Sequence, residues 1–189
     1  QSANNAETMT LYVQNTGNGL MDKTTVGFNT DATNQFDNQL DAVKLSGALS
    51  RHTLYTYNAD PLQWYSKNMN TSIAQSSTVN VGFEPGTNGN YSMSFDGLQS
   101  FDPTSYIMLE DKKLNVFHNV RNGAYSFTAN ATDNWNRFVL HFTPKAEFNT
   151  VNSTCNSAGQ ITIEQPGTAV WNYSISNNQN GVVVAAGVL

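Results

Sequence analysis

The chain has 189 residues and a formal net charge of −5 at pH 7, and this acidic balance excludes the basic footprint of a nucleic-acid-binding domain. Only 12% of its residues are charged, whereas Asn, Thr and Ser number 26, 20 and 16, so its polarity comes mainly from amides and hydroxyls. No apolar run approaches the roughly 20 residues that a membrane-spanning helix requires, and we expect no insertion into a membrane.

Apolar and polar residues alternate with a period of two along most of the chain, which is typical of half-buried antiparallel β-strands. Turn dipeptides such as Asn88-Gly89 and Asn122-Gly123 separate the alternating segments. Many short strands between such turns predict an all-β fold, an antiparallel β-sandwich of the jelly-roll kind. In chain order the predicted strands cover residues 9–13, 24–28, 42–45, 54–57, 78–83, 91–95, 106–109, 114–120, 125–129 and 136–143, and one helical turn is predicted within residues 60–69.

A domain boundary is expected where this pattern stops, just after Phe142. The chain beyond it carries three further apolar patches, at residues 160–163, 170–175 and 182–185. The sequence thus predicts three parts: a sandwich domain over residues 1–145, a linker over residues 146–154 and a small, incomplete β domain over residues 155–189.

About 35 residues are too few for a stable sandwich, so the segment from Gly181 to Leu189 is expected to expose a strand edge. The simpler interpretation is that the chain is a truncated piece of a longer protein. The alternative is self-association, in which this segment pairs with another copy of the chain by strand exchange.

Five sequence segments form an ordered set of motifs: DATNQFDNQLDAVKL at residues 31–45, VGFEPG at 81–86, IMLEDK at 107–112, NGAYSFTA at 122–129 and NRFVLHF at 136–142. In this order they resemble a β-sandwich domain found near the C-terminal ends of large secreted and cell-surface proteins of Bacteroidetes, which the type IX secretion system typically exports. Residues 155–167 and 171–175 resemble the start of the immunoglobulin-like repeat that often follows. The resemblance implies export, surface exposure, a modular parent protein and an Ig-like second domain, and it supplies no catalytic residue.

Cysteine usage also bears on the compartment. The single cysteine, Cys155, excludes an internal disulfide framework and a cysteine-based zinc cluster. Few cysteines, little Lys and much Asn and Thr fit an exported bacterial protein that is extracellular or displayed at the cell surface. The absence of a basic, apolar leader at Gln1 is expected if a signal peptide has been removed.

Three aspartates, Asp31, Asp37 and Asp41, lie in one segment with Asn34 and Asn38. Carboxylate and amide oxygens are the ligands that calcium prefers, so these aspartates are predicted as ligands of a structural calcium ion. The alternative is that they cap turns, because Asp and Asn side chains accept hydrogen bonds from neighbouring backbone N–H groups.

Four aromatic residues, Tyr55, Tyr57, Trp64 and Tyr65, cluster in a short stretch. Exposed aromatic rings can stack on the apolar faces of sugar rings while neighbouring amides bond the hydroxyls. These residues are therefore predicted as a carbohydrate-binding platform. The alternative is core filling, because aromatic side chains dominate the cores of β-sandwiches.

The sequence contains no convincing set of catalytic residues. The histidines His52, His118 and His141 form no Ser-His-Asp order, and no nucleophile elbow is present. Glu84, Glu110 and Asp111 could supply a carboxylate pair for glycoside hydrolysis, although residues 110–112 are more simply a solvated strand end. We expect no catalytic residue and no enzyme activity.

The sequence therefore favours a non-catalytic module of an exported bacterial cell-surface protein, acting in adhesion or structural presentation. Its expected partners are surface polysaccharides or other cell-surface components. Two alternatives stay open: a carbohydrate-binding module attached to a polysaccharide-degrading enzyme, and an extracellular filament subunit joined by strand exchange.

Overall fold

The computed structural model describes residues 7–29, 31–33, 36–45, 51–57, 64–70, 77–143, 147–156, 159–164, 172–176, 179–180 and 182–188. The regular secondary structure of these residues is nearly all β-strand, with two single-turn 3₁₀ helices and no α-helix, which confirms the predicted all-β fold class. They include no helix long and apolar enough to cross a membrane. The strands are β1 (Glu7–Asn15), β2 (Met21–Phe28), β3 (Ala42–Val43), β4 (Thr53–Tyr57), β5 (Trp64–Asn70), β6 (Ser77–Glu84), β7 (Gly89–Asp96), β8 (Tyr106–Asp111), β9 (Val116–Asn119), β10 (Tyr125–Ala129), β11 (Phe138–Thr143), β12 (Glu147–Val151), β13 (Gln160–Glu164), β14 (Asn172–Ser176) and β15 (Val183–Val188).

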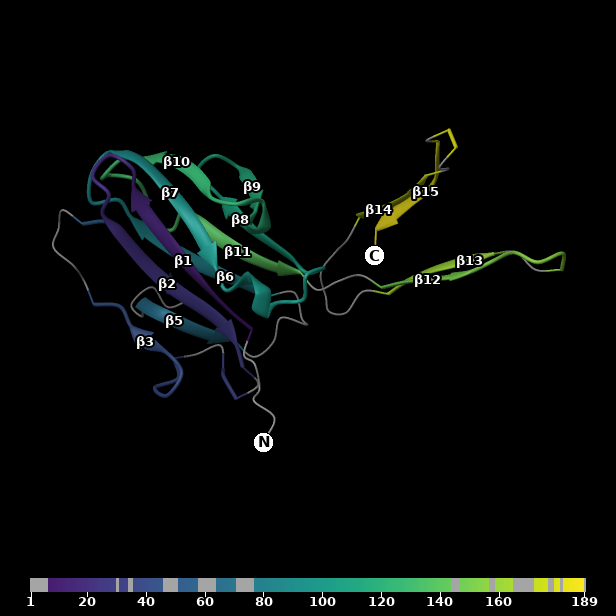
Figure 1. Ribbon diagram of the computed structural model, residues 1–189, viewed down its shortest axis with the longest axis horizontal. Helices are drawn as coiled ribbons and strands as arrows, with labels where there is room; N and C mark the ends of the chain where they lie inside the picture. The colour runs from purple at the N-terminus through teal and green to yellow at the C-terminus, as the bar shows by residue number, and fades with distance from the viewer. Residues whose placement is uncertain are drawn as a thin grey trace.

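Strands β1 to β11 form one continuous sheet that folds over on itself into a sandwich (Figure 1). One layer has the order β10-β7-β1-β2-β5, and the other has the order β4-β6-β11-β8-β9. Strand β5 joins the two layers because it pairs in parallel with β2 and, through its first residues, antiparallel with β4. The remaining pairings of this sheet are antiparallel, including that of β3 with β5.

The core lies between the two layers and consists of every second side chain of the strands. In β1, Met9, Leu11 and Val13 are fully buried while the residues between them are partly exposed. Aromatic rings join the layers edge to face: the ring centres of Phe28 and Phe142 lie 4.8 Å apart, and Phe127 and Phe138 lie 5.0 Å apart. Such contacts add to the free energy of burying the rings themselves, so the alternation read from the sequence is the pattern that builds the core.

The structure differs from the sequence prediction at strand β5. The helical turn predicted within residues 60–69 is wrong for residues 64–69, which belong to β5, while residues 60–63 lie outside the described part of the chain. Pairing with three other strands outweighs the weak local preference of this segment. The segment predicted as a linker, residues 146–154, contains strand β12, which pairs with β13.

Beyond the sandwich, the described residues form two separate two-stranded sheets, β12-β13 and β14-β15. A two-stranded hairpin is marginally stable in water by itself, and Val151, Ile161 and Val183 are exposed. The division into domains and self-association through residues 181–189 both stay predictions.

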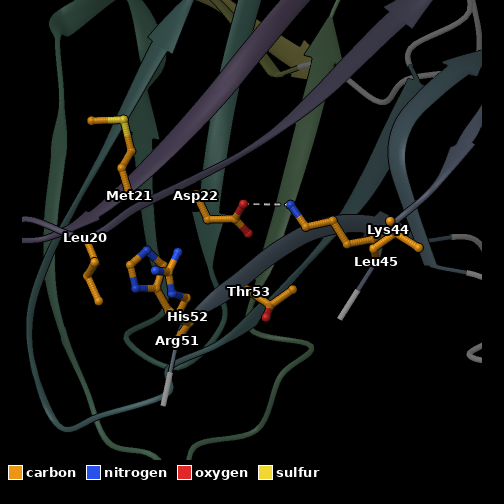
Figure 2. A pocket seen from close by; sticks show the side chains of 8 residues that line it. All are labelled: Leu20, Met21, Asp22, Lys44, Leu45, Arg51, His52 and Thr53. Atoms are coloured by element: carbon orange, nitrogen blue, oxygen red, sulfur yellow. Dashed lines mark hydrogen bonds and ion pairs between the residues drawn. The ribbon is translucent and has the colours of Figure 1, made fainter. Parts of the chain in front are cut away.

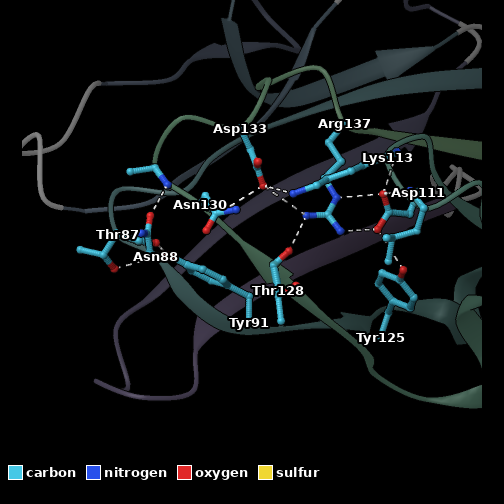
Figure 3. A network of polar contacts seen from close by, with 12 residues as sticks. Thr87, Asn88, Tyr91, Asp111, Lys113, Tyr125, Thr128, Asn130, Asp133 and Arg137 are labelled. Atoms are coloured by element: carbon cyan, nitrogen blue, oxygen red, sulfur yellow. Dashed lines mark hydrogen bonds and ion pairs between the residues drawn. The ribbon is translucent and has the colours of Figure 1, made fainter.

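A buried ion pair closes one end of the sandwich (Figure 3). Arg137, directly before β11, donates from Nε and Nη2 to the two carboxylate oxygens of Asp111 on β8, at 2.8 and 2.5 Å. Its Nη1 donates to the carbonyl oxygen of Thr128 on β10 at 2.7 Å. The guanidinium therefore ties β8 of one layer to β10 of the other. The Cζ atom of Arg137 also lies 4.7 Å from the ring centre of Phe127, within cation–π range.

Further donors saturate the Asp111 carboxylate. The hydroxyl of Tyr125 donates to Oδ2 at 2.9 Å, and the backbone N–H groups of Lys113 and Leu114 donate to Oδ1 at 3.0 and 3.3 Å. Burial raises the pKa of Asp111, but the hydrogen bonds and charge of Arg137 outweigh burial and lower it below its ordinary value. Burial and the bond to Asp111 raise the pKa of Tyr125 to about 12. The pair is therefore ionised at neutral pH and each charge is compensated.

Substitution of Arg137 is expected to destabilise the sandwich strongly. Arg137 and Asp111 are only 3% and 1% exposed, so Arg137→Met leaves a buried carboxylate without its counter-ion, which typically costs about 3–5 kcal/mol. The matched control is Lys113→Met, which removes the cation of the more exposed Lys113–Asp133 pair, whose side chains are 41% and 15% exposed, and which should cost less than about 1 kcal/mol. Urea unfolding measures both free energies, and equal losses would contradict a special role for the buried pair.

Candidate functional site

A pocket of about 180 Å³ opens beside the first residues of β2 and β4 (Figure 2). Residues from three separate segments meet in it: the start of β2, the chain directly after β3 and the start of β4. The lining residues are Leu20, Met21, Asp22, Lys44, Leu45, Arg51, His52 and Thr53.

The hairpin between β1 and β2 positions the first of these segments. Gly19 adopts a left-handed conformation with φ of 73°, which suits glycine, and the side chain of Asn15 accepts hydrogen bonds from two backbone N–H groups of the turn. The resulting register places Asp22 opposite the fully buried Val13. Asp22 therefore continues the inward-facing row of β2, so its carboxylate lies where the apolar core ends.

Both oxygens of the Asp22 carboxylate are occupied. Oδ1 accepts a hydrogen bond from Lys44 Nζ at 2.7 Å, and Oδ2 accepts one from the backbone N–H of Leu54 at 2.7 Å. The same ammonium donates to the carbonyl oxygen of Lys23 at 3.0 Å. Two of the three N–H groups of Lys44 are therefore committed, and its position in the pocket is fixed.

His52 forms the inner wall of the pocket. Its ring is buried, and Nε2 lies 3.1 Å from the carbonyl oxygen of Val13. A carbonyl oxygen only accepts, so Nε2 carries the proton and donates, and Nδ1 is the unprotonated nitrogen of the neutral ring. The ring also packs edge to face on Tyr91 with the centres 5.5 Å apart, which joins the pocket wall to the aromatic core.

The surroundings keep His52 neutral. Burial lowers the pKa of His52 below its ordinary value, and the positive charges of Arg51 and Lys44 lower it further. The hydrogen bond to Val13 and the charge of Asp22 raise it, but by less. The two cations therefore lie close enough to act electrostatically on one imidazole, although they are separate in sequence.

Arg51 is the remaining charged group of the pocket. It is exposed, and no carboxylate of the described residues forms an ion pair with it. With Lys44 balanced by Asp22 and His52 neutral, the pocket carries one positive charge in excess. A guanidinium offers five N–H donors in a fork that matches a carboxylate, so the arrangement is suited to receiving an anionic oxygen pair.

The predicted carbohydrate platform is wrong for two of its four residues. Tyr55 is 0% and Tyr57 9% exposed, because both pack under Trp135 on the outer side of β4, with ring centres 6.3 and 4.9 Å from the indole. Gly82 leaves room for this packing: a Cβ there would lie 2.2 Å from the Tyr55 ring. The platform stays a prediction for Trp64 and Tyr65, whose side chains lie outside what the structure describes.

The predicted calcium ligands are not gathered into one cluster; within the described ranges no three His, Cys, Asp or Glu residues are placed to hold a metal ion. Asp37 Oδ2 accepts from the backbone N–H of Thr33 at 2.7 Å, and Asp41 Oδ2 accepts from the backbone N–H of Asp37 at 3.0 Å. The backbone N–H of Asp31 donates to Oδ1 of Asn29 at 2.9 Å. Asp37 and Asp41 therefore cap a turn, which was the alternative interpretation.

The other two histidines lie apart from the pocket. His118 donates from Nε2 to the carbonyl oxygen of Gly123 at 2.9 Å, and Nε2 of His141 lies 2.7 Å from Glu110 Oε2. The expectation that residues 110–112 form a solvated strand end is wrong for Asp111, which is buried against Arg137.

Sequence reasoning missed the pocket as a site. Asp22 lies 22 positions before Lys44, and His52 has no partner within its own stretch of sequence. The available signal was weak: two of only nine basic residues, Lys44 and Arg51, lie close together in an otherwise uncharged stretch. The strand pairing that brings Asp22 to them is not encoded in any local motif.

Residues 2–142 match a protein family described as "Domain of unknown function (DUF8693)". No curated protein and no solved structure matches the chain. The match covers β1 to β11 nearly in full, and thus the whole two-layered sandwich together with the pocket.

Acid is expected to destabilise the protein through His52. Because the pKa of His52 is lower in the folded chain, the unfolded chain binds more protons once the pH falls below about 6.5. The stabilising contribution is therefore fully present above pH 6.5 and is lost as the pH falls through the folded-state pKa.

Urea unfolding between pH 7.5 and 5, together with an NMR titration of the imidazoles, measures this effect. His52→Gln should flatten the pH dependence in that range, whatever its effect on absolute stability. His141→Gln, on the outer face, is the matched control. A measured pKa for His52 at or above 6.5 would contradict the assignment.

Proposed function

We propose that the chain, which belongs to the DUF8693 family, is a non-catalytic module of an exported bacterial cell-surface protein and acts in adhesion or structural presentation. The observation that carries the proposal is that polar side chains of the sandwich bond to one another or to the backbone. The buried Arg137 and Asp111 saturate each other, and His52 and His118 are tied to backbone carbonyl oxygens. These groups stabilise a rigid scaffold, whereas a catalytic acid or base needs to reach a substrate proton.

Two further features support an extracellular setting. The ordered motifs resemble a sandwich domain of type IX-secreted surface proteins, and the chain carries few charges but many amides and hydroxyls. The hairpins β12-β13 and β14-β15 continue the chain beyond the sandwich, as in a modular parent protein. A rigid sandwich within such a protein is suited to holding a binding surface away from the cell.

A carbohydrate-binding module attached to a polysaccharide-degrading enzyme is the second candidate. One observation favours it: Tyr106 on β8 and Phe117 on β9 are exposed on one layer of the sandwich. The ring centre of Phe117 lies 5.5 Å from that of His141, which contacts Glu110 at 2.7 Å. Exposed rings beside hydrogen-bonding groups are a combination that binds sugars.

Deletion of the sandwich tests the leading proposal. Removal of residues 2–142 from the surface protein in the producing bacterium should reduce attachment of the cells to their natural surface, because the module supplies or presents the contact. Cell counts on that surface measure the effect, and re-expression of the intact protein serves as the control. Unchanged attachment and unchanged surface assembly would contradict the proposal.

The second candidate predicts a different result. Binding of the purified chain to neutral glycans on an array should disappear with Tyr106→Ser or Phe117→Ser, because each change removes an exposed ring without opening the core. Tyr12→Ser, on the layer formed around β1, is the control and should retain binding. An array without any bound glycan would count against this function and leave the leading proposal standing.

A further inference from the structure

We infer that the pocket between Asp22, Lys44 and Arg51 binds a carboxylate group carried on a sugar ring, so that the module recognises a uronate-containing polysaccharide. This inference rests on the proposed adhesion function and names the ligand class for it. The residues that line the pocket all fall within the part of the chain that matches the family. The pocket has an excess of positive charge, whereas the whole molecule is negative.

The first argument is the placement of positive charge. The chain carries only nine Lys and Arg residues against 14 Asp and Glu, yet two of the nine line one pocket of about 180 Å³. At physiological ionic strength, screening limits the range over which the net charge of −5 repels an anion to about 8 Å. The local excess of one positive charge therefore decides which ions the pocket attracts.

The second argument is the state of the donors. Lys44 is held by Asp22 and by the carbonyl oxygen of Lys23, so its third N–H is oriented before a ligand arrives. Arg51 has no ion-pair partner of the described residues, and its fork can donate two parallel hydrogen bonds to one carboxylate. Asp22 does not compete as an acceptor, because Lys44 and Leu54 occupy both of its oxygens.

The third argument concerns the rim. Leu45 is 86% and Met21 56% exposed, and both border the pocket that Arg51 enters (Figure 2). Figure 2 shows Met21 and Leu20 on the side of the pocket away from Lys44. Apolar side chains beside a cation match a pyranose ring, which presents C–H groups on its face and, in a uronate, a carboxylate at its edge.

The weakness of a single exposed ion pair favours a polymer over a small molecule. Such a pair changes a binding constant by a factor of about five or less, which is too little for a tight monovalent site. A polysaccharide with a carboxylate on successive rings, bound by many displayed copies of the module, gains affinity through effective concentration.

An NMR titration of the full chain with oligogalacturonate tests the inference. The backbone signals of Leu45 and of Arg51, His52 and Thr53 should shift, and the affinity should fall as salt is added. Arg51→Gln should weaken binding about fivefold and leave the thermal midpoint unchanged, because Arg51 is exposed. The matched control is Lys23→Gln, which removes the same charge from an exposed side chain outside the pocket lining and should retain the wild-type affinity.

Two ligand controls separate the alternatives. Methyl-esterified oligogalacturonate, which keeps the rings and loses the charge, should bind at this pocket at least about fivefold more weakly than the free uronate, and equal binding of the two would overturn the assignment to a carboxylate. A peptide with a free C-terminal carboxylate that binds as well as the uronate would overturn the assignment to a glycan. Equal binding by wild type and Arg51→Gln, or no shifts at all, would overturn the site, while the loss of attachment on deletion would still support the adhesion function. If oligogalacturonate binds at the pocket but deletion of residues 2–142 leaves attachment unchanged, the site would stand and the adhesion function would be contradicted.

Discussion

The ion pair between Arg137 and Asp111 is the contact on which the closed end of the sandwich depends. Its guanidinium spans both layers and lies against the ring of Phe127. From there the aromatic contacts run through Tyr91, 5.8 Å from Phe127, to His52. One aromatic cluster is thus bounded by a buried cation at one side and by a buried neutral imidazole at the other. Ring contacts therefore connect the buried ion pair, whose disruption is costly, with the wall of the pocket.

Period-two alternation predicts the fold class and most of the strands of the sandwich. The residues 125–129 form β10 as predicted, and Met9 to Val13 lie inside β1. The segment that became β5 was misjudged because its conformation is set by its neighbours: it joins the two layers and pairs with β2, β3 and β4. A single sequence carries the local preference of a strand, and it does not carry the identity of its partners.

The polar sites were out of reach for the same reason. Asp111 is separated by 26 positions from Arg137 and Asp22 by 22 from Lys44, so no motif or spacing marks either pair. Alternation also fails to say which face of a strand is covered. Tyr55 and Tyr57 point away from the inter-layer core, as an exposed platform requires, but Trp135 from a distant loop covers them. Turn capping by Asp37 and Asp41 is local, and it was accordingly among the interpretations that the sequence allowed.

Because the chain has few charged residues, the partners of each charged side chain indicate its role. Arg137 and Lys44 are matched by Asp111 and Asp22, and Lys113 is matched by Asp133. In each case the carboxylate also accepts backbone N–H groups, so the pair orders a turn or a strand end as well as balancing charge. Arg51, like Lys23, Lys112 and Arg121, forms no ion pair with a carboxylate of the described residues, but of these four it is the one that lines the pocket with Lys44. A free guanidinium is well solvated and adds little to folding stability, and its place beside an organised set of donors is better explained by an anion that arrives from outside.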